Sequence, residues 1–374
     1  MQHGIKRVSL SEAARKAKIE KDKAKIAHYR RLTKQVLQEK KSKVYTVETL
    51  GHTTELLALN PEFNAVWNFR RHILLSLFEE GGIDVDQAIN DDLRMVMGQL
   101  KLYPKCYWIW NHRTWCLQEL ESLGKANWTF ELGIVSKLLE ADSRNFHGWH
   151  YRRYVVQQIE SKAVKEAKTP SDKALSTLKI DLDEFRYTTQ KITKNISNFS
   201  AWHNRSKLIP KIFSLIAEDP DRKTLEHDYR EELALFSSPH HLLLKELEMV
   251  KTGMYMDPED TSVWLYMKWL LSETLFVDDL KATNSEAYRD ILRRMLADVE
   301  ELNGLEKDDS PTNADNVWCL KLIIFIKSLI NEDEGRREFL DSEIIDSLNR
   351  LIELDPLRKG HYLDQISGEA PVIC

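Results

Sequence analysis

The chain has 374 residues, is 42% hydrophobic and 30% charged, and contains only 13 Gly and 10 Pro. This composition favours helices over many short strands, and a net charge of −5 gives no general reason to expect nucleic-acid binding. No stretch approaches the ~18 uninterrupted apolar residues of a membrane-spanning helix, and the first 25 residues are too charged for a secretory signal. The four cysteines form no CxxC pair, which predicts a reducing, cytoplasmic location.

The first predicted element is a charged helical arm. Residues 10–43 are rich in Lys, Arg and Glu and carry only a weak apolar stripe, so we assign 1–43 to an N-terminal arm. We treat 1–374 as one helical-repeat domain, in which 44–330 hold the repeats and 331–374 form a terminal helical pair and tail.

Tryptophans mark the repeats that follow the arm. Each clear copy reads Trp, then Asn or His, then any residue, then Arg, and Pro or Asx lies six or seven residues before the Trp. Because Pro and Asx favour turns and helix starts, each repeat is interpreted as helix, turn, helix, with Trp in the second helix. The four clear copies are Trp67 to Arg70, Trp110 to Arg113, Trp149 to Arg152 and Trp202 to Arg205, and weaker copies contain Trp264 and Trp318.

Apolar residues at helical spacing support this interpretation, as in Leu93, Val96, Met97 and Leu100. The longer repeats contain insertions near 163–176, 218–238 and 303–314, which we expect to be surface loops or helix extensions. We therefore predict an all-α fold, a right-handed superhelical solenoid of about seven helical hairpins. The expected helix pairs are 46–79, 85–121, 127–160, 176–216, 240–275, 284–330 and 339–367.

The repeat resembles that of protein prenyltransferase α-subunits. Tetratricopeptide arrays have a 34-residue period and HEAT arrays lack the Trp pattern, so neither fits as well. The resemblance implies a crescent-shaped α-subunit that is active only as a heterodimer with a β-subunit. It also implies that the β-subunit binds zinc and the isoprenyl diphosphate, and that the zinc activates an acceptor cysteine thiol.

The resemblance points to site residues in two repeats. Family members place a Lys and a Tyr of a Pro-Lys-x-Tyr stretch against the diphosphate, and Lys105 and Tyr107 match them here. Asn145, Phe146 and His147 match an Asn-Tyr-His stretch, so Asn145 and His147 are candidate substrate contacts. The motif arginines are expected to be structural or interface residues rather than catalytic ones. His147 and His150 lie three residues apart without a third ligand at suitable spacing, so we expect no metal in this chain.

Three features favour a Rab-type α-subunit over the one shared by farnesyltransferase and type I geranylgeranyltransferase, which act on CaaX proteins. The start, Met1 to Arg7, and the segment Leu354 to Lys359 resemble Rab-type sequences. CaaX enzymes place a Gln after the Tyr, where its amide holds the substrate carboxylate, and this chain has Trp108, whose indole offers one N–H donor.

The Rab-type interpretation implies a specific reaction and specific partners. Geranylgeranyl diphosphate would be the co-substrate, and Rab GTPases presented by an escort protein would be the acceptors. We expect the escort on the outer surface, around 225–300, and whether His3 acts near the active site is left open. Larger animal versions carry extra domains, for which we see no space here. A shared CaaX-type α-subunit and a non-enzymatic helical adaptor remain as alternatives.

Overall fold

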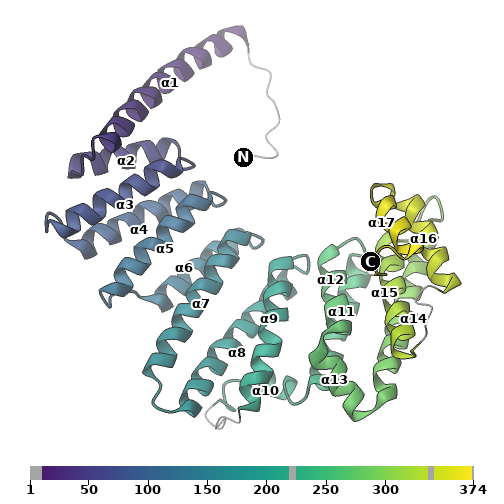
Figure 1. Cartoon of the computed structure of the whole chain (residues 1–374). Helices are drawn as coiled ribbons and strands as arrows, with labels where there is room; N and C mark the ends of the chain where they lie inside the picture. The colour runs from purple at the N-terminus through teal and green to yellow at the C-terminus, as the bar shows by residue number, and fades with distance from the viewer. Residues whose placement is uncertain (1–10, 219–224, 336–340, 373–374) are drawn as a thin grey trace. The chain divides into compact units, whose positions relative to one another are not determined.

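The computed structural model describes residues 11–218, 225–335 and 341–372 (Figure 1). The segment Met1 to Arg7, including His3, lies outside these ranges. Every regular element of the described residues is helical, which confirms the all-α prediction. None of these helices combines the length and apolar character that crossing a bilayer would require.

Backbone contacts divide the chain into two compact units, with the boundary between Val155 and Val156, inside α7. The first unit contains the helices up to the first half of α7, and the second contains the rest. The bounds in the first unit are α1 (Glu12–Lys41), α2 (Val47–Leu59), α3 (Asn64–Glu79), α4 (Val85–Leu102), α5 (Tyr107–Ser122), α6 (Trp128–Ala141) and α7 (Phe146–Glu166).

The second unit continues with α8 (Pro170–Lys194), α9 (Phe199–Ala217), α10 (Arg230–Leu235), α11 (Pro239–Met256), α12 (Thr261–Ser272), α13 (Thr274–Thr283), α14 (Ser285–Asp309), α15 (Val317–Asp333), α16 (Ser342–Leu354) and α17 (Lys359–Ser367). A single 3-10 turn, η2 (Pro356–Arg358), precedes α17. Consecutive helices pair in both units, for example α4 with α5, α8 with α9 and α14 with α15.

The predicted pairs agree with these hairpins to within a few residues, apart from the end of α7 and the start of α8, which each differ by six residues. The insertion near 163–176 is largely a helix extension, because α7 reaches Glu166 and Thr169 opens α8 with a reciprocal capping box to Asp172. In the 218–238 insertion, residues 219–224 lie outside the description, and the remainder includes the short helix α10. Helix α13 is an additional element that the predicted pairs did not contain.

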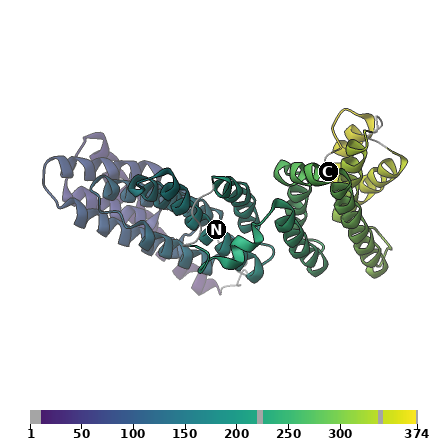
Figure 2. The ribbon, with the colours of Figure 1, turned by 90° about the horizontal axis from the view of Figure 1, so that it is seen from below.

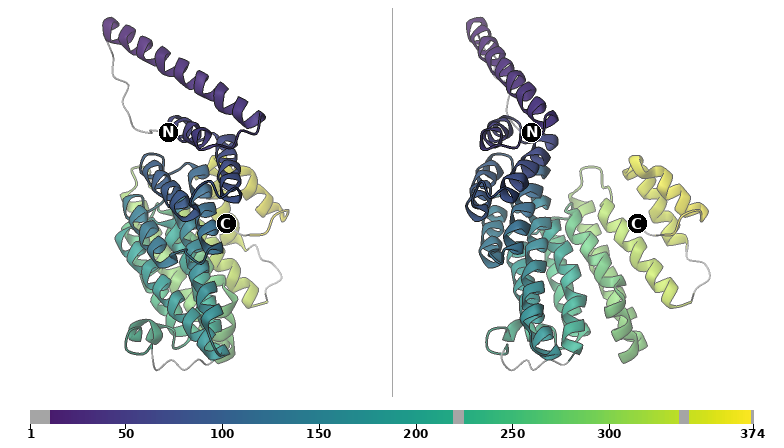
Figure 3. Two further views of the ribbon diagram at one scale, coloured as in Figure 1. Left: turned by 90° about the vertical axis from the view of Figure 1, so that its left-hand side faces the viewer. Right: turned by 60° about the vertical axis from the view of Figure 1, so that its left-hand side comes forward.

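The N-terminal arm is a single long helix whose packing is uneven. Its buried apolar residues, Leu32 and Val36, lie in its C-terminal half, which packs on α2. Its other half projects from the first unit, as both views in Figure 3 show. The described part of the arm is therefore one helix, of which only the C-terminal half joins the core.

The repeated tryptophans fix the turns. Each of five is buried and donates its indole N–H to the backbone carbonyl oxygen six residues earlier, over 2.6–2.9 Å. One ring thus fills the hairpin interior and satisfies a turn carbonyl that the helix cannot reach. These five are Trp67, Trp110, Trp149, Trp202 and Trp264.

The last copy of the repeat is built differently. Trp318 is half-buried, and the Lys321 ammonium lies 4.9 Å from its ring centroid. Lys321 also bonds Asp355 at 3.1 Å, and Asp355 accepts from Tyr362 at 2.8 Å. These contacts tie α15 to the helices at the C-terminal end, drawn in yellow in Figure 2. Leu320, Ile324 and Leu348 belong to the apolar cluster of this end.

Candidate functional site

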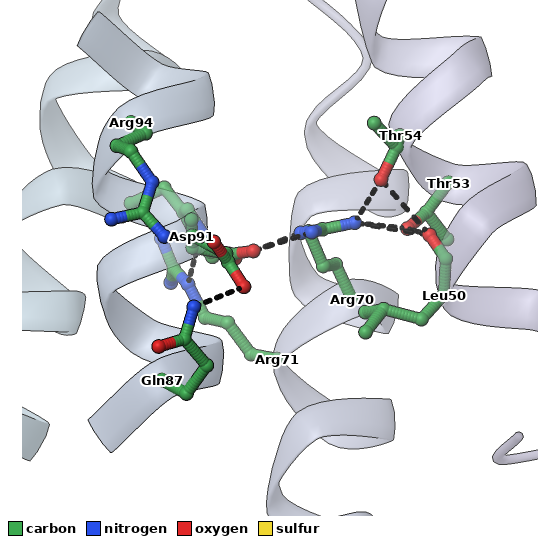
Figure 4. Close-up of polar contacts among 10 residues, drawn as sticks. Leu50, Thr53, Thr54, Arg70, Arg71, Gln87, Asp91 and Arg94 are labelled. Carbon is green, nitrogen blue, oxygen red and sulfur yellow. Dashed lines mark hydrogen bonds and ion pairs between the residues drawn. The ribbon is translucent and has the colours of Figure 1, made fainter. Parts of the chain in front are cut away.

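A buried arginine joins each hairpin to the next. Arg70 on α3 makes a bidentate ion pair with Asp92 on α4. Its remaining nitrogen donates to Thr53 and Thr54 on α2, both at 2.8 Å (Figure 4). The carboxylate of Asp92 also bonds the Nε2 atom of His112 at 2.7 Å. One carboxylate is thus shared by the hairpin before it and the helix after it.

The same three-residue junction recurs twice. Arg113 pairs with Glu131 at 2.6 and 2.7 Å, and the Tyr151 hydroxyl donates to Glu131 at 2.7 Å. In the second unit, Arg205 pairs with Glu246 at 2.6 and 2.8 Å, and Tyr266 donates to the same carboxylate at 2.7 Å. Because all of these side chains are buried, the pairs fix how neighbouring hairpins meet.

Arg152 occupies the equivalent position between the two others. It is buried and donates to Ser136 at 2.7 Å, as Arg70 and Arg205 donate to threonines 16 residues earlier. The motif arginines therefore make buried contacts within and between the hairpins.

Two carbonyl contacts hold the turn that carries Lys105. The Pro104 carbonyl oxygen accepts from the Trp110 indole and from the Asn145 side-chain amide, both at 2.9 Å. The Cys106 thiol is buried and donates to the Pro61 carbonyl oxygen at 3.3 Å. Lys105 lies between these anchored residues, is exposed, and has no ion-pair partner among the described residues. Its ammonium is therefore presented to solvent from a well-supported turn.

Asn145 faces the interior of the chain. It is buried, and its side-chain oxygen accepts from the backbone N–H groups of His147 and Gly148, which caps the start of α7. Its amide reaches Pro104, so this residue couples the start of α7 to the turn before Lys105. The sequence placed Asn145 among candidate substrate contacts, and here both the oxygen and the nitrogen of its side chain bond backbone groups of the chain.

Tyr107 and His147 lie beside each other, with ring centroids 6.1 Å apart in an edge-to-face arrangement. Tyr107 is 53% exposed, and its ring centroid lies 5.3 Å from that of Trp108, also edge to face. Burial lowers the pKa of His147, and the nearby His150 lowers it further. Both effects favour the neutral form of His147, whose ring packs against Tyr107.

Both rings line a groove of about 660 Å³ between α3, α5 and α7. Its lining contains Arg71 and Arg153 but no carboxylate. Burial lowers the pKa of both guanidinium groups. Arg71 donates to Asn111 at 2.7 Å and to His112 at 3.3 Å, so it is directed along α5. The groove presents positive charge and aromatic faces next to Tyr107.

The sequence interpretation missed two sets of residues here. The junction carboxylates Asp92, Glu131 and Glu246, and the buried Glu184, each lie 18 residues before a repeat Trp, a regularity that the sequence already contains. The groove arginines follow the motif arginine directly, as Arg70-Arg71 and Arg152-Arg153. Searching for repeated polar positions at the Trp register would have found both sets.

Asp92, His112 and Cys116 form a buried cluster whose ligand atoms lie within 4.8 Å of one another. Burial would raise the pKa of Asp92, but hydrogen bonds from Arg70 and His112 outweigh it and lower that pKa to about 2. Burial lowers the pKa of His112 to about 4, and it raises the pKa of the Cys116 thiol well above its usual value. With both His112 nitrogens engaged, the cluster fits an ion-pair network better than a metal site.

Comparison with known proteins places this architecture in a family. Four segments, 89–120, 128–159, 181–212 and 243–274, match the protein prenyltransferase alpha subunit repeat. Each contains one repeat tryptophan from Trp110 to Trp264. A chain of the Candida albicans protein geranylgeranyltransferase-I complexed with GGPP shares the fold, with a TM-score of 0.56, 18% identity, and 91% and 90% of the two chains covered.

Full-length relatives make the assignment narrower. The geranylgeranyl transferase type-2 subunit alpha of Candida albicans is 49% identical over 100% of this chain and 99% of its own length, and that of Saccharomyces cerevisiae is 37% identical over 96% and 98%. The rat protein of the same name is 33% identical over 72% of this chain, which spans 41% of the rat length. The chain belongs to the protein prenyltransferase α-subunit family. Within it, the relatives matched over their full length are type-2 geranylgeranyl transferase α-subunits, which confirms the resemblance inferred from the repeats.

Proposed function

We propose that the chain is the α-subunit of a heterodimeric Rab geranylgeranyltransferase, which transfers a geranylgeranyl group from geranylgeranyl diphosphate to C-terminal cysteines of Rab GTPases. The observation that carries this proposal is the anchored turn with its exposed, unpaired Lys105, next to Tyr107 and a groove without carboxylates. Full-length similarity to type-2 α-subunits supports it independently. The β-subunit would be an obligate partner, and the complex would act in the cytosol.

The chemistry assigns distinct roles to this chain. Zinc on the β-subunit would supply an activated acceptor thiolate. When the thiolate attacks C1 of the prenyl group, the bond from C1 to oxygen breaks and the diphosphate leaves with its electron pair. Lys105 would then neutralise charge that grows on the leaving oxygens, and the Tyr107 hydroxyl would donate a hydrogen bond to them. No proton needs to leave either residue.

The remaining site residues would act by position. Asn145 would hold the turn through Pro104, and His147 would pack the Tyr107 ring without adding charge. Trp108 would fill the place at which CaaX enzymes hold a carboxylate. Because positioning to a fraction of an ångström matters for charge stabilisation, loss of Asn145 would slow transfer even without substrate contact.

Replacement of Lys105 tests the catalytic part of the proposal. In the purified heterodimer, Lys105→Ala should lower the single-turnover rate of geranylgeranyl transfer about 10²- to 10³-fold, by analogy with removal of one preorganised donor from an oxyanion site. Tyr107→Phe should cost less, since one neutral hydrogen bond is lost. Lys168→Ala, at an exposed lysine of another interhelical turn, is the matched control. An unchanged rate for Lys105→Ala would remove this residue from the site.

The acceptor class needs a separate experiment. The heterodimer should modify Rab proteins only with an escort protein present, and it should leave short CaaX peptides unmodified because position 108 offers no amide. Charge reversals on the outer faces of α11 and α14, within 225–300, should weaken escort binding. Efficient modification of a CaaX peptide without escort would restore the CaaX alternative. A chain that never joins a β-subunit would support the adaptor alternative.

A further inference from the structure

A second groove lies on a different face of α5 from the one beside Tyr107. It has a volume of about 790 Å³ and is lined by α4, α5 and α6. Leu117 and Leu120 of α5 contribute buried apolar surface, Met97 extends it on α4, and Phe130 and Ile134 extend it on α6. Phe130 is 66% exposed, so the groove presents apolar surface that no part of the described chain covers.

The two long walls of this groove run in the same direction. Lys125, just before α6, bonds Asp86 in the first turn of α4 at 3.0 Å, so the two helices begin side by side. Further along, Arg113 bridges the Leu93 carbonyl on α4 and the Glu131 carboxylate on α6. The lining stretches, 90–101 and 127–141, are about 16 and 21 Å long at 1.5 Å per residue. The groove is therefore an elongated trough.

The charges of the trough differ between its ends. At the end where α4 and α6 begin, Lys125 is paired with Asp86. Midway along α4, Arg94 is paired with Asp91, as Figure 4 shows. At the opposite end, Lys101 and Lys137 are exposed and have no carboxylate partner among the described residues. The one carboxylate in the lining, Glu131, is buried and bonded by Arg113 and Tyr151. Free positive charge is thus confined to one end.

An apolar trough with free cations at one end matches a single apolar chain that carries an anionic head. We propose that it binds an isoprenyl diphosphate, with the chain along Leu117, Met97 and Ile134 and the diphosphate between Lys101 and Lys137. Two ammonium groups suit a head with two phosphates better than a single carboxylate. The choice of an isoprenoid over another lipid rests on the proposed function. This site is separate from the turn of Lys105.

Binding stoichiometry tests the proposal. Purified heterodimer is titrated with geranylgeranyl diphosphate in equilibrium dialysis, and two sites per heterodimer are expected. The Lys101→Gln/Lys137→Gln variant should weaken one site at least tenfold, and Ile134→Asp should abolish it. The control Lys168→Gln, at an exposed lysine outside the trough, should stay within twofold of the wild type. Lysines near the C-terminal ends of helices stabilise those helices. Thermal unfolding of each variant is therefore measured as well, to separate a loss of stability from a loss of binding.

Several results would overturn the proposal. One site per heterodimer in the wild type would do so, as would a second site that Ile134→Asp leaves unchanged. Oleate or uncharged geranylgeraniol binding there as tightly as the diphosphate would show that the site is a general lipid groove. Single-turnover transfer is recorded in parallel. If transfer is absent while Ile134→Asp still removes a diphosphate site, the proposed function fails and the groove assignment stands.

Discussion

The junctions centred on Asp92 and on Glu246 have the same geometry and a different third partner. Both place a buried arginine in a bidentate pair with a carboxylate from the next hairpin. At Asp92 the third side chain is His112, whereas at Glu246 it is Tyr266. Burial lowers the pKa of His112 to about 4 but raises the pKa of Tyr266 well above its usual range. One repeat position therefore decides whether a junction responds to mild acid.

The largest expected effect comes from removing the buried arginine, which has an equivalent in each junction. Arg205→Met leaves the Glu246 carboxylate buried and without its cation, which should cost about 3–5 kcal/mol of unfolding free energy. The double variant Arg205→Met/Glu246→Leu should recover much of that loss, because no charge remains buried. Urea unfolding of both variants measures the difference. If Arg205→Met were as stable as the wild type, the ion pair would contribute nothing to the unfolding free energy.

A pH titration should separate the two junctions. The folded-state pKa of His112 is about 4 and its ordinary value is 6.5, so the unfolded chain takes up this proton first as the pH falls. The contribution of neutral His112 to the unfolding free energy is fully present above pH 6.5. It is lost as the pH falls from 6.5 to 4, and the loss is on the order of 3 kcal/mol. His112→Gln should reduce the pH dependence of the unfolding free energy between pH 6.5 and 4. Tyr266→Phe should leave this pH dependence the same as in the wild type. Equal slopes in the wild type and His112→Gln would contradict the assignment.

The repeat tryptophans offer a smaller contrast. Trp264→Phe removes the indole bond to the Pro258 carbonyl and part of a buried ring, which should cost about 1–3 kcal/mol. Thermal unfolding is a sufficient measurement, and Trp269→Phe, which loses a contact to Glu273 at a part-buried site, is a useful reference. A cost below that of the reference would mean that the turn does not depend on the indole.

The smallest effect is expected at the last repeat. Trp318 is half-buried and lies beside Lys321, so Trp318→Phe should change the unfolding free energy by less than about 1 kcal/mol. Lys321→Met, in contrast, would leave Asp355 without one of its partners. If Trp318→Phe proved as costly as Trp264→Phe, the two repeats would be more alike than their contacts indicate.

Most of the fold could be predicted from the sequence because tryptophan recurs once in each repeat. In five turns it makes the same hydrogen bond to the backbone carbonyl six residues earlier. The sequence did not predict α13, which follows α12 after a single residue, Glu273, that is the C-cap of one helix and the N-cap of the next. For the site, the sequence identified the turn and its exposed lysine. It did not reveal that Asn145 faces inward, because an amide next to a motif looks the same whether it binds a ligand or a backbone carbonyl.

The Pro104 carbonyl, bonded by Trp110 of its own hairpin and Asn145 of the next, limits how freely this array can be recombined. Repeat arrays are often treated as interchangeable modules that can be cut at any turn. Here the second and third hairpins should be exchanged together. A crossover between them would remove the hydrogen bond from Asn145 to the Pro104 carbonyl of the Lys105 turn. Chimeras with related arrays should therefore keep residues 85–166 from one parent. A crossover at the turn before α4 would also have a cost, because it would separate the Pro61 carbonyl from the Cys106 thiol and Arg70 from Asp92.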